Sequence, residues 1–267
     1  MDSIERKKVL PLVIFAETTP LFTLDDLRER YGKRSGDRSI RNMVYRLKLQ
    51  GRIRRVAAGV YTGTLAGTPF NRYAVPARLR EDAVVAFHSG LEFHGVANQT
   101  FRTMYYLSAR ARSDVVFGSD TFHRVAPPQQ LVRAGKLDFQ VKFGPGKVRV
   151  TGRERSLIDC LLMLDYSGGV EELDRCLGMF PSFDFEVAVD YLKLLRKPWL
   201  YARLGYLLDR HADRFSFYGK SRDRFLKQLP RGVVYLERKK AGGHWVATWN
   251  LMVPSSLAPS AVKEGKP

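Results

Sequence analysis

The segment from residue 20 to residue 63 limits the possible folds of this chain more than any other. It reads TLDDLRERYG, then SGDRSIRNMVYRLKLQGRI, then RRVAAGVYTG. Thr23 followed three residues later by Asp26 fits a capping box, which indicates that a helix begins there. Asp25 and Asp26 complement the positive end of the helix dipole, and Gly32 is expected to end the helix in a left-handed conformation. The segment therefore begins with a short capped helix.

A second helix is expected to begin near Ser35 or Asp37. At about 100° per residue, its apolar side chains fall on one face of a helical wheel. These are Ile40, Met43, Val44 and Leu47. The opposite face carries side chains that can donate to base edges in a major groove. They are Arg38, Arg41, Asn42, Tyr45, Arg46 and Lys48.

After Gly51 the pattern changes to that of two short strands. Ile53 and Val56 alternate with arginines, and Ala57-Ala58-Gly59 then leads into Val60-Tyr61-Thr62, which predicts a hairpin. We expect its arginines to contact phosphates or enter a minor groove; they are Arg52, Arg54 and Arg55. Helix, link, helix and hairpin form a winged helix-turn-helix, a device that reads DNA. The alternative is an ordinary helical corner with a solvated basic face.

The charge distribution favours a polyanionic partner. The formal net charge is +18, with 17 basic and 7 acidic residues in positions 1–80 and 14 basic and 4 acidic residues in positions 193–240. The middle, 81–192, is slightly acidic. Two basic blocks predict salt-sensitive binding to nucleic acid. The second block is interpreted equally well as a nucleic-acid surface or as a solvated helical face.

The sequence also indicates a cytoplasmic compartment. No stretch approaches the roughly 20 apolar residues of a membrane-spanning helix, and the start does not resemble a signal peptide. The apolar run from Val9 to Ala16, interrupted by Pro11, is expected to supply a first helix. Cys160 and Cys176 lie in apolar helical patterns and are interpreted as core thiols.

The fold class is expected to be α+β, with a winged helix-turn-helix followed by a mixed α/β and helical C-terminal domain. The expected regions are a DNA-binding domain at 1–66, a linker at 67–80, a C-terminal domain at 81–253 and a disordered tail at 254–267. Within the C-terminal domain, strands are expected to about 151, helices over 152–230 and a terminal hairpin at 233–238 and 245–251. Expected strands before 151 are 104–108, 139–143 and 147–150. The expected helices are 82–93, 156–164, 170–179, 185–195 and 199–211.

Four segments together resemble one known family. They are the 20–63 segment, FHSGLEFHGVANQ, VTGRERSLIDCLLMLDYSGGVEELDRCL and YARLGYLLDRH. Their order resembles the AbiEi family of antitoxins from type IV toxin-antitoxin systems, over about residues 8–235. The resemblance implies a repressor that binds double-stranded operator DNA in its own operon and a C-terminal domain needed for antitoxicity. It also implies a nucleotidyltransferase-like toxin as functional partner, without direct contact.

Other patterns leave two alternatives open. Asp138 with Gln140-Val141-Lys142 loosely resembles the acid-x-lysine strand of metal-dependent nucleases, although glutamine replaces the second carboxylate. An RNA-binding module could use the same basic surfaces. His88 and His94 are six residues apart, which does not suit two zinc ligands on one helical face. We therefore expect no catalytic residue, metal or cofactor, and no enzymatic activity.

Overall fold

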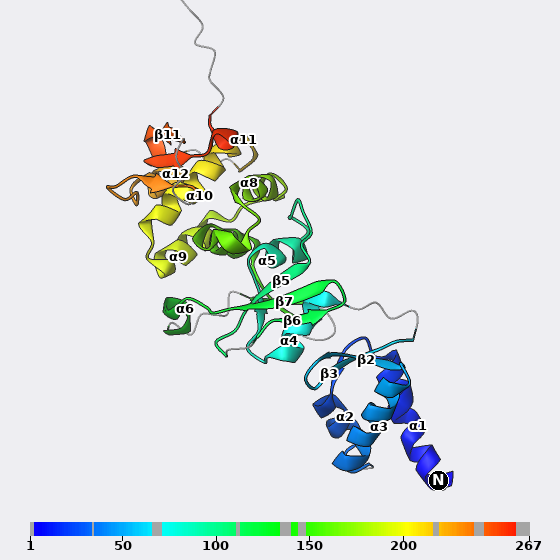
Figure 1. Ribbon diagram of the computed structural model, residues 1–267. Coiled ribbons are helices and arrows are strands. Elements are labelled where there is room, and N and C mark those ends of the chain that lie inside the picture. Colours follow the sequence, from blue (N-terminus) through cyan, green and yellow to red (C-terminus); the bar gives the residue numbers. More distant parts are fainter. Residues whose placement is uncertain are drawn as a thin grey trace, which may run out of the picture. The chain divides into compact units, whose positions relative to one another are not determined.

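The computed structural model describes residues 3–33, 35–65, 71–110, 113–133, 140–143, 148–215, 219–237 and 243–259, with the side chains at 3–10, 130, 133 and 140–143 excepted. The fold is mixed α/β (Figure 1). Among the described residues, no helix is long and apolar enough to cross a membrane.

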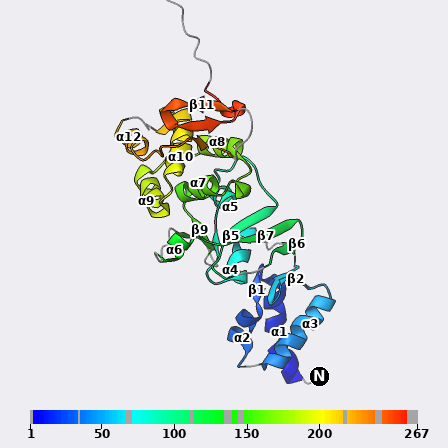
Figure 2. The same ribbon diagram turned by 60° about the vertical axis from the view of Figure 1, so that its left-hand side comes forward.

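The N-terminal part combines three helices with a small antiparallel sheet. The helices are α1 (Ser3–Thr18), α2 (Leu24–Tyr31) and α3 (Asp37–Leu49). The strands, in the order β1-β3-β2, are β1 (Phe22–Thr23), β2 (Ile53–Ala57) and β3 (Val60–Gly63). Helices α1 and α3 lie side by side in both ribbon views (Figure 1 and Figure 2). The helix expected around Pro11 is present, and α1 runs through this proline.

A six-stranded sheet follows, in the order β6-β7-β5-β4-β9-β8. Strand β5 pairs in parallel with β7 and antiparallel with β4. The strands are β4 (Val84–Val85), β5 (Thr103–Leu107), β6 (Val115–Phe117), β7 (Asp120–Val125), β8 (Gln140–Phe143) and β9 (Val148–Thr151). Short helices accompany them: η1 (Arg72–Ala74), α4 (Val75–Leu79), α5 (His88–Phe93) and α6 (Gln129–Arg133).

The rest of the described chain is mainly helical. Its helices are α7 (Arg153–Leu162), η2 (Leu164–Tyr166), α8 (Val170–Gly178), α9 (Phe185–Leu195), α10 (Pro198–Arg210), α11 (Ala212–Phe215) and α12 (Lys220–Leu226). A small sheet, β10 (Val234–Tyr235), β11 (His244–Val246) and β12 (Leu251–Val253), is accompanied by η3 (Ala247–Trp249) and η4 (Ser255–Leu257). Trp249 packs so closely on α10 that a Cβ at Gly205 would overlap its ring.

The chain forms two compact units. The first contains residues 1–85, 102–126 and 142–149, and the second contains 86–101, 127–141 and 150–267. The first unit therefore joins the N-terminal helices to most of the large sheet. The sequence-based division, with a linker at 67–80, places its boundary differently.

Several local predictions are confirmed. Thr23 accepts from the Asp26 amide, and the Asp26 carboxylate accepts from the Thr23 amide, so the capping box is present. Helix α3 begins at Asp37, and the expected hairpin forms as β2 and β3. Gly59 supports its turn with a φ of +76°, a conformation that favours glycine.

Two local predictions are wrong. Gly32 ends α2 in a right-handed conformation, with φ at −57°. Glycine fits there because a Cβ would overlap the carbonyl oxygen of Arg28. The segment 82–93, expected as one helix, divides into β4 and α5. Val84 and Val85 are buried and pair with β5, as β-branched residues favour.

The C-terminal end also differs from expectation. Strand β12 pairs in parallel with β10 and antiparallel with β11, so a three-stranded sheet replaces the expected terminal hairpin. Residues 254–259, expected in a disordered tail, include η4, where Leu257 is buried and its carbonyl accepts from the Tyr206 hydroxyl. Residues 260–267 lie outside the described part of the chain.

Candidate nucleic-acid interface

Helix α3 separates its apolar and polar side chains cleanly. Ile40, Val44 and Leu47 are buried in one cluster with Leu12 of α1 and Leu27 of α2. The side chains predicted to face DNA are exposed on the opposite side: Arg38, Arg41, Asn42, Tyr45, Arg46 and Lys48. The large aromatic side chain of Tyr45 is 61% exposed.

Arg28 ties the start of α3 to α2. Its guanidinium contacts Asp25 and Asp37, each at 2.6 Å. The hydrogen bond from Arg28 lowers the pKa of Asp37. Arg41 also reaches Asp37, one turn back on α3, at 2.9 Å. Asp37 therefore orients Arg28 and Arg41 and keeps a carboxylate at the positive end of the α3 dipole.

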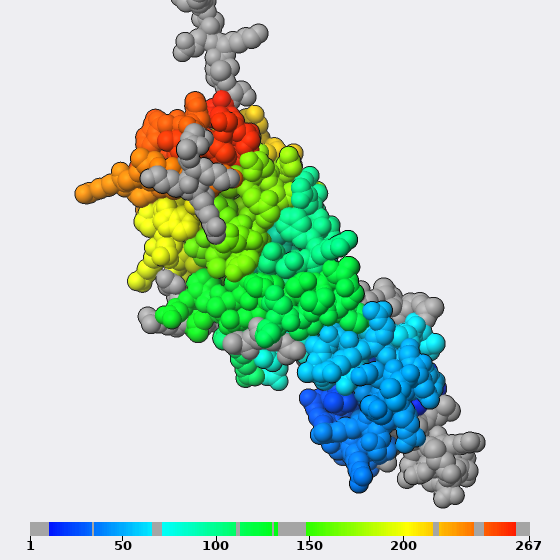
Figure 3. All heavy atoms as spheres, viewed as in Figure 1, coloured from blue at the N-terminus to red at the C-terminus, as the bar shows by residue number. Residues whose placement is uncertain are grey.

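The hairpin that follows α3 packs on the large sheet through its buried apolar side chains. Val56 and Val60 are buried in a cluster with Met104 of β5 and Phe122 of β7, all within the first unit. In the space-filling view, the light-blue residues of α3 and this hairpin contribute to the visible surface of that unit (Figure 3).

The three hairpin arginines, although exposed, each contact the chain itself. Arg52 forms an ion pair with Glu17. Arg54 lies over the Phe117 ring, 4.6 Å from its centroid, and Arg55 donates through Nε to the carbonyl of Ala57 at 3.3 Å. These contacts restrict the orientation of all three guanidinium groups. The sequence pattern did not indicate this restriction.

Four arginines of the second basic block have partners inside their own unit. Arg203 is half-buried and donates to the carbonyl oxygens of Tyr235 and Leu161, and desolvation lowers its pKa to about 10. Three other arginines pair with carboxylates: Arg210 with Asp174, Arg222 with Asp209 and Arg224 with Glu186. This favours the structural interpretation for these four arginines, whereas Arg196, Lys197, Lys220 and Lys227 are exposed.

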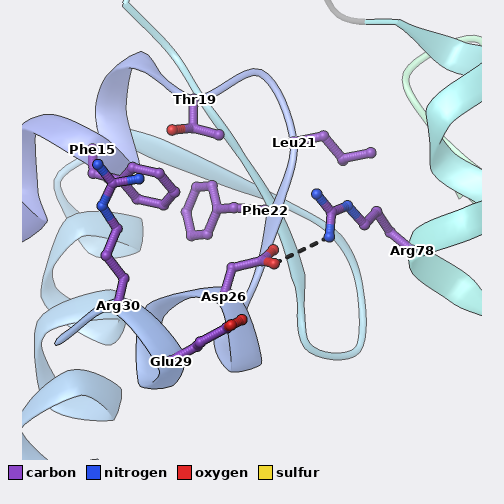
Figure 4. A pocket seen from close by; sticks show the side chains of 8 residues that line it. All are labelled: Phe15, Thr19, Leu21, Phe22, Asp26, Glu29, Arg30 and Arg78. Carbon is purple, nitrogen blue, oxygen red and sulfur yellow. Dashed lines mark hydrogen bonds and ion pairs between the residues drawn. The ribbon is translucent and has the colours of Figure 1, made fainter. Parts of the chain in front are cut away.

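A cavity of about 490 Å³ opens beside α2 (Figure 4). Apolar side chains of Phe15, Leu21 and Phe22 line one part of it. Two charged side chains meet at another, where Arg78 of α4 donates to Asp26 at 3.1 Å. Because Asp26 is also the reciprocal member of the capping box, Arg78 steadies the start of α2.

Within the described residues, the two histidines that were considered as a zinc pair have different partners. His94 contacts the carbonyl of Thr151 through Nε2, at 2.8 Å, whereas both ring nitrogens of His88 face carboxylates. Asp138 of the nuclease-like pattern lies outside the described residues, as do the side chains of Gln140 and Lys142. The nuclease interpretation therefore stays a prediction.

The turn at Gly168-Gly169 is structural. Both glycines have positive φ, at +79° and +100°, and Ser167 accepts from the Gly169 amide. Glu172 is buried and faces His88. Helical i, i+4 spacing of His88 with Glu92 and of Glu172 with Cys176 was the only sequence signal for this cluster.

Comparison with known proteins identifies a solved structure with a similar fold. No protein-family model matches the chain, and no curated protein matches it. Among solved structures, the chain is similar to the crystal structure of the RV2827C protein from Mycobacterium tuberculosis. The TM-score is 0.63 at 15% sequence identity, over 95% of this chain and 92% of that chain. At this identity the similarity shows a shared fold.

Proposed function

We propose that this protein is a sequence-specific regulator that binds double-stranded DNA through its N-terminal winged helix-turn-helix. The observation that carries the proposal is the exposed polar face of α3, opposite the buried Ile40, Val44 and Leu47. In this proposal α3 enters the major groove, where arginine and asparagine can form paired hydrogen bonds with base edges. The side chains nearest the bases are Arg38, Arg41, Asn42 and Tyr45.

The remaining cations of this face position the protein on the duplex. Arg46 and Lys48 extend from α3, and Arg52 and Arg55 extend from the hairpin, where each can reach phosphate. Arg54 acts mainly through Phe117, by holding the hairpin against the large sheet. In this proposal, the polar side of α3 reads the base sequence. The cations at the edges of that side and on the hairpin supply the salt-dependent part of the affinity.

The resemblance to the AbiEi family supports a more specific role. We propose that the protein represses its own operon and serves as the antitoxin of a type IV toxin-antitoxin system. Its functional partner would be a nucleotidyltransferase-like toxin from a neighbouring gene. The second unit would carry antitoxicity without direct toxin contact, so the two activities are separable by mutation.

The DNA assignment is tested with the full chain and a binding site selected from random duplexes. Arg41→Ala is expected to cost about 1–3 kcal/mol and to relax preference at one base pair. Lys48→Ala is expected to weaken all sequences alike and to flatten the salt dependence by about one unit. Arg175→Ala, an exposed cation on α8, is the matched control and leaves both properties unchanged. If Arg41→Ala keeps parental affinity and base preference, the major-groove assignment fails.

Competition separates the proposal from its alternatives. Tighter binding to single-stranded RNA or tRNA than to the selected duplex would favour the RNA-binding module. Degradation of nucleic acid with added magnesium or manganese that disappears in Lys142→Ala would establish the nuclease. The antitoxin role requires that co-expression with the neighbouring gene product restores growth, and that Arg41→Ala retains this rescue while losing repression.

A further inference from the structure

A buried polar cluster lies in the second unit, whereas the residues proposed to read DNA belong to the first. His88, at the start of α5, is fully buried, and its ring stacks on Phe101 with centroids 4.0 Å apart. Its Nδ1 lies 3.0 Å from the carboxylate of Glu92, and its Nε2 lies 3.0 Å from that of Glu172. A buried histidine held between two carboxylates is costly unless charge is balanced there.

Cys176 brings a sulfur atom to the same place. It lies one turn after Glu172 on α8, and its Sγ is 3.3 Å from Oε1 of Glu172. One ligand atom from each of His88, Glu172 and Cys176 lies within 4.8 Å of the other two, and all three residues are buried. Ligands of one tetrahedral metal ion, with bonds of about 2.0–2.3 Å, lie at comparable separations.

Glu92 contacts His88 in the way that a carboxylate commonly contacts a metal-binding histidine. A histidine that binds metal through one ring nitrogen commonly donates its other N–H to a carboxylate, which fixes the tautomer and the orientation of the ring. Glu92 accepts at Nδ1 of His88 and also from the Phe101 amide at 2.9 Å. Nε2 is thereby directed at Glu172 and Cys176.

We propose that His88, Glu172 and Cys176 form a structural zinc site that joins α5 to α8. Nitrogen, oxygen and sulfur donors together suit zinc, whereas a thiolate disfavours magnesium and calcium. Zinc displaces the thiol proton of Cys176, which otherwise lies on the Glu172 carboxylate, and the resulting thiolate and this carboxylate then balance the charge of the ion.

Groups around the Glu172 carboxylate can supply a fourth ligand. Asn98 donates from Nδ2 to Oε2 of Glu172 at 3.0 Å, and the Gln99 amide donates to Oε1 at 2.9 Å. The second Glu172 oxygen or the side-chain oxygen of Asn98 can complete four-coordination. The ion would thus also fix the segment that connects α5 to β5.

The test measures metal in the full chain, without DNA, so its result is independent of the proposed regulatory function. Protein purified without chelators or metal-affinity steps is expected to hold about one zinc per chain by elemental mass spectrometry. After chelation, added Co²⁺ is expected to produce a sulfur-to-cobalt charge-transfer band. Cys176→Ser loses this band, whereas Cys160→Ser, at a buried cysteine outside the cluster, keeps it.

Glu92→Gln separates a metal site from a purely structural cluster, because it leaves all three ligands in place. It is expected to retain one zinc per chain and to bind it about 10–100-fold more weakly, measured against a chromophoric chelator. Circular dichroism verifies that each variant is folded. The proposal is overturned if folded parental protein takes up no stoichiometric zinc, or if Cys176→Ser gives the parental cobalt spectrum.

Discussion

The guanidinium carbon of Arg54, on β2, lies 4.6 Å from the ring centroid of Phe117, on β6. The sequence pattern grouped Arg54 with the other hairpin arginines as a DNA contact. The structure gives it an aromatic partner in the first unit, next to the apolar cluster that contains Val56, Val60 and Phe122. A cation over an aromatic ring at an exposed position contributes about 0.5–1 kcal/mol.

Arg54→Ala is therefore expected to lower the free energy of unfolding by about 0.5–1 kcal/mol, because the cation–π contact is lost. Its effect on DNA affinity should be smaller than that of Arg46→Ala, which removes an exposed cation of α3. Urea denaturation and fluorescence anisotropy measure the two quantities. Phe117→Leu is the matched variant, and it should reproduce the stability loss. An Arg54→Ala protein with parental stability and strongly weakened DNA binding would return Arg54 to the DNA-contacting set.

Thr23→Ala tests the capping box that begins α2. The hydroxyl of Thr23 accepts from the Asp26 amide at 3.1 Å, and its loss leaves one helix amide without this acceptor. We expect a loss of about 1 kcal/mol in the free energy of unfolding. Thr23→Ser retains the acceptor and should keep most of the stability. Equal losses in the two variants would show that the threonine methyl group, and not the hydroxyl, stabilises this position.

Arg155 and Asp159 form a buried ion pair on α7. Their exposed fractions are 1% and 2%, the Nε–Oδ2 distance is 3.3 Å, and the Tyr191 hydroxyl donates to Asp159 at 2.5 Å. Arg155→Met should cost about 3–5 kcal/mol, because it leaves a buried carboxylate without its cation. Adding Asp159→Leu should recover much of this loss. Thermal and urea unfolding measure both.

Tyr191→Phe is the control for this ion pair, because it removes one hydrogen bond and no charge. We expect it to cost about 1–3 kcal/mol. If Arg155→Met costs no more than Tyr191→Phe, the ion pair is not what stabilises this part of the core.

Asp174 makes the free energy of unfolding depend on pH. Burial opposes its ionisation, but hydrogen bonds from His211 and Arg210 outweigh this and lower its pKa from 3.8 to about 2. Because the folded pKa is the lower one, the carboxylate stabilises the fold above about pH 4, and this contribution is lost as the pH falls towards 2. Allowing for solvent screening, it amounts to about 1 kcal/mol.

Asp174→Asn tests this dependence. The variant should be less stable than the parent at neutral pH, and the difference should shrink as the pH approaches about 2. Urea unfolding across this range measures it. Asp190→Asn, at a carboxylate that is 63% exposed and pairs with Lys193, serves as the control and should follow the parental curve. If the difference in the free energy of unfolding between Asp174→Asn and the parent stayed constant with pH, Asp174 would stabilise the fold by packing and not by its charge.

Local sequence patterns were sufficient for the elements that depend on neighbouring residues. Thr23 and Asp26 are three positions apart, so the capping box could be identified from spacing alone. The apolar stripe of α3 follows from helical periodicity, and α9 occupies the predicted residues 185–195. These features arise within one or two turns, where local propensity and burial favour the same structure.

Contacts between distant residues could be found only in the tertiary structure. His88 and Glu172 are 84 positions apart, and no periodicity indicates that α5 and α8 bring them together. Strands β6 and β7 and the parallel pairing of β7 with β5 were missed, because sheet order depends on packing.

The sequence by itself determined a capped helix, an amphipathic helix with a polar arginine-rich face, and a basic hairpin, because each is set by short-range spacing. The tertiary structure decided which charges remain at the surface and which are used inside. It paired Arg210 with Asp174, placed Arg54 on Phe117 and enclosed His88 between two glutamates. Charge and burial become specific only when distant segments pack together, since the dielectric environment of each side chain is a property of the fold.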